Sequence, residues 1–386
     1  MSYTNLPLQG RGRSISDKNM FPDEIYVERD KAVKKMAGEL GLAGIIFYGG
    51  TLSRGVVSYL NGARNANSFM TTMWIVPKEA KTVVLTTIDA RATRNAPERF
   101  YSTVPIGLNL MANDHIGVQT GKYLKDNDLL TGKWGIVNGA SIPYTAYQAL
   151  LAVEGVDLVD VSASYEELKS IKSSGQLYGL SYSSSFAQRA VFDFIRLAQP
   201  GTVPIELIAD LERGMRMNGI EHASFLISRG KKTAFTVAEE TPLKEGELVS
   251  LFADIQYYNC HGAYASSTVI GGANDAQKNL IGKAKSLLDE TVSEIESKMS
   301  AHIGYRSVDE SGSYIIVNSI GADLVDAPAW DGKIVELKPR IALNITANIC
   351  DPNIGSTVES RTAVVSKNGL NILNDFGPQQ LSGQYS

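Results

Sequence analysis

Apolar residues in the first part of the chain alternate between helical and strand spacing. Residues 23–40 carry apolar side chains three or four positions apart and end at Gly41, which predicts a helix. Further apolar runs predict a series of shorter elements: a strand at 43–48, a hairpin over 73–86, a strand at 134–137, a helix at 144–153 and a strand at 156–161. Strands that alternate with helices are typical of an α/β domain.

The pattern changes near Ser162, where long helices and long strands begin. Helical spacing predicts helices at 165–171, 176–197, 204–217 and 275–299. Apolar and alternating runs predict strands at 247–255, 262–270, 314–317, 341–349 and 362–366, the first two flanking a turn at 258–261. We therefore expect a second domain of a different architecture, with a linker near residues 160–170.

Composition excludes several classes of function. The chain has 386 residues, of which 44% are apolar and 20% charged, enough for two globular domains. The net charge of -4 and the absence of concentrated Lys and Arg argue against nucleic acid or an acidic membrane as a partner. No apolar run approaches the ~20 residues of a membrane helix, and the first residues lack a signal core, so we expect a cytoplasmic protein.

Five short motifs follow one another between residues 168 and 339. They are Leu168-Lys169-Ser170-Ile171-Lys172-Ser173, Gln199-Pro200-Gly201-Thr202, Gly219-Ile220-Glu221, Leu243-Lys244-Glu245-Gly246-Glu247-Leu248-Val249 and Leu337-Lys338-Pro339. Their order resembles the pita-bread family, which includes creatinase, aminopeptidase P, prolidase and methionine aminopeptidase. Residues 21–29 and the strand near residue 45 resemble the N-terminal domain of creatinase-type members.

The resemblance implies three regions and a dimer. We expect a flexible tail over residues 1–20, a creatinase-type α/β domain over 21–162, and an α+β pita-bread domain with the active-site cleft over 163–386. Creatinase-type relatives also imply a homodimer.

Most metal ligands of the family are replaced in this chain. In metal-dependent members two aspartates, one histidine and two glutamates hold two divalent ions that activate a water molecule. The resemblance places the first ligand at Asp254 and the others at Ser267, Asn318, Thr346 and Ser360, or at Glu359 if the last strand has one inserted residue. Hard divalent cations need several anionic oxygens, so the chain is interpreted as a divergent member with no metal and no other cofactor.

The catalytic residues of creatinase, which works without a metal, are also not found at the corresponding positions of this chain. That branch hydrolyses a C–N bond with a histidine as acid and base, and the resemblance puts this histidine near Phe235 and the family His-Glu pair at Val325-Asp326. All four histidines therefore fall outside the catalytic positions of the family. We expect His302 to end the helix at 275–299, where a cation complements the helix dipole.

A remodelled polar cleft is the expected site. The candidate catalytic residues are Asp254, Tyr264, Asn318 and Glu359, and the candidate substrate-binding residues are Phe235, His261, Ser267, Asp323, Asp326, Thr346 and Arg361. Asp254 is either a general base or a residual carboxylate bonded to nearby Ser, Thr and Asn side chains. Cys260 and His261 are adjacent on an extended chain, so they point apart and do not form a nucleophile-base pair.

Several of these residues keep a structural alternative. Arg361 either clamps a substrate carboxylate or pairs with Glu359 or Asp254. Asp323 and Asp326 precede a proline, where acids often only shape a turn.

Three functions remain open at this point. The first is a metal-independent creatinase-like enzyme that acts on a small polar amine, amide or amino-acid derivative by C–N hydrolysis, rearrangement or elimination. The second is a non-catalytic pita-bread module, a pseudo-metallopeptidase, that binds a peptide or partner protein. The third is a metallo-aminopeptidase with displaced ligands.

Overall fold

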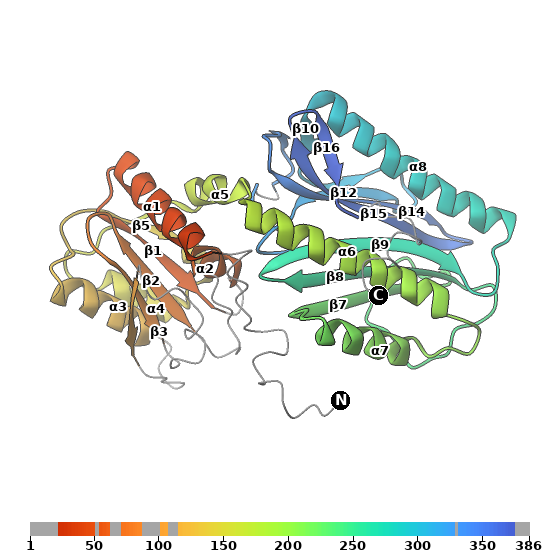
Figure 1. Cartoon of the computed structure of the whole chain (residues 1–386), viewed down its shortest axis with the longest axis horizontal. Coiled ribbons are helices and arrows are strands. Elements are labelled where there is room, and N and C mark those ends of the chain that lie inside the picture. Colours follow the sequence, from red (N-terminus) through yellow and green to blue (C-terminus); the bar gives the residue numbers. More distant parts are fainter. Residues whose placement is uncertain are drawn as a thin grey trace. The chain divides into compact units, whose positions relative to one another are not determined.

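The chain folds into two compact units (Figure 1). The structure, a computed structural model, describes residues 22–50, 54–61, 71–86, 101–106, 115–328 and 331–374. Of these, the residues up to Lys169 form the first unit, and those from Ser170 onward form the second. Among the described residues, no helix has the length and apolar character needed to cross a membrane.

A six-stranded mixed sheet forms the centre of the first unit. Its order is β4-β3-β2-β1-β5-β6, with β1–β2 and β2–β3 antiparallel and the other pairs parallel. The strands are β1 (Gly44–Gly49), β2 (Thr72–Pro77), β3 (Thr82–Thr86), β4 (Tyr101–Pro105), β5 (Trp134–Val137) and β6 (Leu158–Asp160). Every residue of β1 and β2 is buried, because helices cover both faces of the sheet.

Those helices form an outer layer on each side. They are α1 (Asp23–Glu39), α2 (Arg54–Asn61), α3 (His115–Asp126), α4 (Tyr144–Leu151) and α5 (Ser162–Ser170). One core contains Phe47 and Trp74 with residues of α1, α2 and α5, and the other contains Ile46 and Ile75 with residues of α3 and α4. The α/β class predicted from the sequence is confirmed, although α2, β4 and α3 were not predicted.

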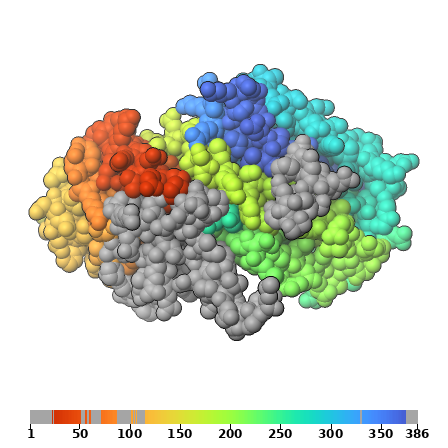
Figure 2. Space-filling model, in the orientation of Figure 1, coloured from red at the N-terminus to blue at the C-terminus, as the bar shows by residue number. Residues whose placement is uncertain are grey.

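Two larger antiparallel sheets, a two-stranded sheet and three helices form the described part of the second unit. The first sheet has the order β7-β8-β9, made by β7 (His222–Arg229), β8 (Leu248–Tyr257) and β9 (Cys260–Val269). Helices α6 (Ser174–Leu197) and α7 (Pro204–Met217) pack against one face through a core that includes Phe194 and Leu251. Figure 2 shows the outer surface of these helices in yellow-green and green. Local signals start both helices, a capping box at Ser173 and a proline in the first turn of α7.

The second sheet has five strands in the order β11-β12-β14-β15-β16. They are β11 (Gly304–Ser307), β12 (Tyr314–Ser319), β14 (Ala342–Asp351), β15 (Gly355–Ser366) and β16 (Gly369–Ile372). Helix α8 (Asp275–Lys298) covers one face, and β10 (Ser300–His302) pairs with β13 (Ile334–Glu336) beside it. The expectation that His302 ends this helix is wrong, because the chain turns at Met299 into β10 and Lys298 occupies the last turn.

The two larger sheets of this unit meet along β9 and β15. The Ser360 hydroxyl accepts a hydrogen bond from the Ala265 backbone N–H at 2.7 Å, and the Thr362 hydroxyl donates to the Ala263 carbonyl at 2.9 Å. Side chains of β15 therefore satisfy backbone groups at the edge of the first sheet. This junction decides which residues of β8, β9 and β15 can face one another.

Candidate functional site

The β8–β9 hairpin sets the geometry of the site. Tyr258 and Asn259 form its two-residue turn with φ of 50° and 54°, as a type I′ turn requires. The Glu221 carboxylate accepts hydrogen bonds from both of their backbone N–H groups, at 2.8 and 3.1 Å. The register that follows pairs Asp254 with Ala263 and Gln256 with His261.

Asp254 and His261 form a buried acid–histidine pair. Residues opposite each other in an antiparallel pair share a face, so Asp254 and His261 are diagonal neighbours on one face. His261 Nδ1 lies 2.9 Å from Asp254 Oδ1 and 3.1 Å from Oδ2. Asp254 is 5% exposed, and the His261 side chain is 13% exposed. The two groups therefore interact with little competition from water.

The pair makes His261 a stronger base than a free imidazole. Burial is the largest single effect and lowers its pKa, whereas the charge and hydrogen bond of Asp254 raise it. The negative charges of Asp323 and Glu221 act in the same direction, and the net result is a pKa above the ordinary 6.5. The backbone N–H of His261 also donates to the Gly321 carbonyl at 2.8 Å, which ties the hairpin to the loop that carries Asp323.

Asp254 and His261 are the predicted site residues that the fold brings into contact, and the charge of Asp323 also acts on His261. The alternative in which Asp254 bonds to nearby Ser, Thr and Asn side chains is not what the structure shows, because its hydrogen-bond partner is His261. Sequence reasoning missed Gln256 and His222, which the strand register places in one row with His261. The sequence did contain a signal for the Asp254–His261 contact. The two residues are seven positions apart and flank a two-residue turn, a spacing that places them diagonally across a hairpin.

Tyr264 points away from this pair. It follows Ala263 on β9 and therefore occupies the opposite face of the sheet. Its ring packs edge-on against Phe192 of α6, with the centroids 5.6 Å apart. The expected contact between Tyr264 and a substrate held at Asp254 is not supported by this geometry.

Glu359 and Arg361 also lie away from Asp254. They share the face of β15 opposite to Ser360, as alternation predicts. Glu359 accepts a hydrogen bond from the Ser266 hydroxyl at 2.7 Å. Arg361 contacts Asp289 of α8 at 3.4 Å, a partner that was not among the expected ones.

Burial raises the pKa of Glu359 to about 7, despite the Ser266 hydrogen bond and the nearby Arg361 charge. A folded-state pKa above the unfolded value of 4.5 gives stability that is fully present below pH 4.5 and is lost as pH rises through about 7. We expect Glu359→Gln to match the native protein near pH 4.5 and to be more stable by about 3 kcal/mol above pH 7. Urea unfolding at several pH values measures this difference, and a pH-independent difference would contradict it.

The positions that the sequence resemblance assigned to metal ligands are engaged in hydrogen bonds within the protein. Ser267 lies opposite Ser250, with the two hydroxyl oxygens 2.7 Å apart, and not opposite Asp254. The Asn318 amide donates to the Leu324 carbonyl at 2.7 Å. The Thr346 hydroxyl donates to the Asn344 side-chain oxygen at 3.0 Å. Within the described ranges, no group of three or more His, Cys, Asp or Glu side chains is placed to hold a metal ion. The donor set therefore does not fit a dinuclear metal centre.

Two further candidates lie elsewhere in the second unit. Phe235 is half-buried in the segment after β7, next to Thr236, which exchanges backbone hydrogen bonds with Ile227. Asp326 is buried in an ion pair with Lys172 at 2.9 Å, and neither side chain is exposed. It also accepts a hydrogen bond from the Ala322 N–H at 3.1 Å, so it shapes the loop beside His261.

This architecture is the pita-bread fold of X-Pro aminopeptidases and prolidases, as the sequence resemblance predicted. The X-Pro aminopeptidase of Thermotoga maritima has a TM-score of 0.73 and 13% identity, covering 90% of this chain and 98% of that chain. The prolidase of Pyrococcus horikoshii has a TM-score of 0.69 and 17% identity, covering 91% and 99%.

Proteins with a similar sequence match a smaller share of this chain than these structures do, and they too are named as peptidases. An Xaa-Pro dipeptidase of Pyrococcus horikoshii is 22% identical over 279 residues, which are 67% of this chain and 79% of that protein. An uncharacterised peptidase of Bacillus subtilis is 22% identical over 240 residues, 58% of this chain and 67% of that protein. No protein-family model matches the chain.

Proposed function

We propose that the chain is a metal-independent hydrolase that cleaves a C–N bond in a small amide or dipeptide. The observation that carries the proposal is the buried Asp254–His261 pair, because a carboxylate on Nδ1 fixes the imidazole tautomer and leaves Nε2 to exchange a proton. Among the described residues, no hydrogen bond engages Nε2 of His261. Asp323, whose negative charge acts on the same imidazole, is the candidate for binding a positively charged group of the substrate.

The proposed reaction uses one proton twice. Nε2 of His261 takes a proton from a water molecule as the water oxygen bonds to the carbonyl carbon. The imidazolium then gives that proton to the leaving nitrogen as the C–N bond breaks. Asp254 stabilises the imidazolium between these steps, which is the same interaction that raises the pKa of His261.

Two observations support this choice of reaction and substrate. The relatives named as Xaa-Pro dipeptidase and peptidase cleave a C–N bond, so peptide-type amides are the first substrates to consider. The Ser267 and Thr346 hydroxyls hydrogen bond to neighbouring side chains, and the Asn318 amide donates to a backbone carbonyl, which favours chemistry by His261 over metal-bound water.

The test is turnover of Xaa-Pro dipeptides and a panel of small polar amides after removal of metals with a chelator. We expect turnover to survive the chelator, and added manganese, cobalt or zinc to leave both the rate and the melting temperature unchanged. Activity that needs metal, with a rise of several degrees in melting temperature at one bound ion per chain, would restore the metallo-aminopeptidase alternative. Saturable binding of a peptide without any turnover would support the binding-module alternative instead.

A further inference from the structure

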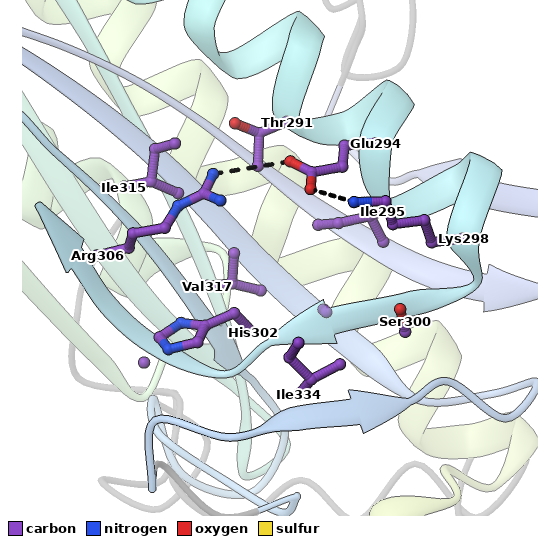
Figure 3. A pocket seen from close by; sticks show the side chains of 12 residues that line it. Thr291, Glu294, Ile295, Lys298, Ser300, His302, Arg306, Ile315, Val317 and Ile334 are labelled. Carbon is purple, nitrogen blue, oxygen red and sulfur yellow. Dashed lines mark hydrogen bonds and ion pairs between the residues drawn. The ribbon is translucent and has the colours of Figure 1, made fainter. Parts of the chain in front are cut away.

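A separate pocket lies on the α8 side of the five-stranded sheet. It is lined by the last turns of α8 and by residues of β10, β11, β12 and β13, and its volume is about 190 Å³. Figure 3 shows its side chains. We call it the α8 pocket. It belongs to a different sheet from the Asp254–His261 pair, so its ligand is independent of the proposed hydrolase reaction.

The floor of the α8 pocket is apolar. Ile295 of α8 and Val317 of β12 are each 4% exposed and belong to the core between helix and sheet. Ile334 of β13 also lines the pocket, yet it is 76% exposed. A ligand that covers this exposed isoleucine gains about 25 cal/mol of binding free energy for each Å² of apolar surface removed from water. The floor therefore favours a ligand with an apolar body.

The rim of the α8 pocket carries a positive charge in excess. Figure 3 shows Glu294 joined by dashed lines to Lys298 and Arg306. The Glu294–Lys298 pair is close, at 2.7 Å, whereas the nearest nitrogen of Arg306 is 3.7 Å from Glu294. One carboxylate cannot neutralise two cations, and a guanidinium has five N–H donors. Within the described part of the chain, this one long contact is the only ion pair of Arg306.

Size and charge together define a ligand class. An apolar cavity of about 150 Å³ holds a benzene molecule, so the α8 pocket has room for one ring or a branched aliphatic group. A guanidinium binds a carboxylate best through two parallel hydrogen bonds. We propose that the α8 pocket binds a small monocarboxylate, with its carboxylate on Arg306 and its apolar body on Ile295, Val317 and Ile334.

Benzoate is the probe for this proposal, with benzamide and benzylammonium as neutral and cationic analogues. Methyl-labelled full-length protein is titrated while the NMR signals of Ile315 and Val317, both in the pocket wall, are followed. We expect saturable shifts with benzoate at a dissociation constant of about 1 mM or below, and at least about tenfold weaker binding of the two analogues.

Variants locate the binding group. Arg306 is 45% exposed in its side chain, so Arg306→Gln should fold normally and should weaken benzoate binding by about tenfold or more. Ile334→Asp, also at an exposed position, places a like charge beside the ligand and should weaken binding in the same way. Lys283→Gln is the matched control, because Lys283 is an exposed cation of α8 that does not line the pocket.

Three results would overturn the proposal. They are the absence of saturable methyl shifts, benzamide binding as tightly as benzoate, and Arg306→Gln binding benzoate as well as Lys283→Gln does. Hydrolase turnover in these variants is a separate measurement, so a failed pocket and a failed active site give different results.

Discussion

Replacing His261 by glutamine should lower kcat/KM by about 10²–10⁴-fold, because the proposed reaction then loses its only proton carrier. The variant should still fold, since the glutamine side chain can hydrogen bond to Asp254 and the hairpin is held by its turn and by Glu221. Steady-state kinetics on the best substrate of the amide panel, together with circular dichroism, measures both quantities.

Asp254→Asn supplies a second readout for the same assignment. The raised pKa of His261 should appear as the acid limb of the kcat/KM profile, with activity rising as pH increases above 6.5. Without the Asp254 charge this limb should move to lower pH, an effect that a purely structural role would not produce. His115→Gln, in the first unit, is the control for a histidine-to-glutamine change. Equal activity of the His261 and His115 variants would remove His261 from the mechanism.

Replacing Lys172 by methionine should reduce the free energy of unfolding of the second unit by about 3–5 kcal/mol. The change leaves the Asp326 carboxylate buried without the cation that lies 2.9 Å away, and water does not reach either side chain. Space for rearrangement is small, because a Cβ on Gly321 would already lie 2.0 Å from Asp326 Oδ2. Urea unfolding followed by circular dichroism measures the loss.

The double variant Lys172→Met with Asp326→Asn tests whether the unpaired charge of Asp326 causes the loss of stability. A neutral asparagine can still accept the Ala322 N–H hydrogen bond while removing the buried charge, so the double variant should recover a large part of the lost stability. Additive losses in the two single variants and the double variant would show that the residues act separately. The loop concerned also accepts a hydrogen bond from the His261 backbone through Gly321, so Lys172→Met is expected to lower activity as well.

Elements with a long, regular pattern could be predicted from the sequence. The helix predicted at 204–217 has the observed bounds, Pro204–Met217, because a proline opens it and an apolar face runs along its whole length. The strand β4 was not predicted because Tyr101–Pro105 is a short run that joins the sheet edge only through pairing with β3. Its environment is created by distant residues, so local spacing carries little information about it.

The site was predictable as a set of residues but not as an arrangement. Asp254 and Asp323 were identified as candidates, whereas Tyr264 and Glu359 were grouped with them although they lie on other faces. Which face a residue occupies depends on strand register and on the junction of β9 with β15, both of which are contacts between distant segments.

By itself the sequence determined the α/β class of the first unit and the change of architecture near Ser162, because these follow from local periodicity and residue type. Only the tertiary structure decided that Asp254 meets His261, that Asp326 meets Lys172 and that Ser267 meets Ser250. The sequence shows that a carboxylate is present, but its pKa and its hydrogen-bond partner depend on the groups that the folded chain places beside it.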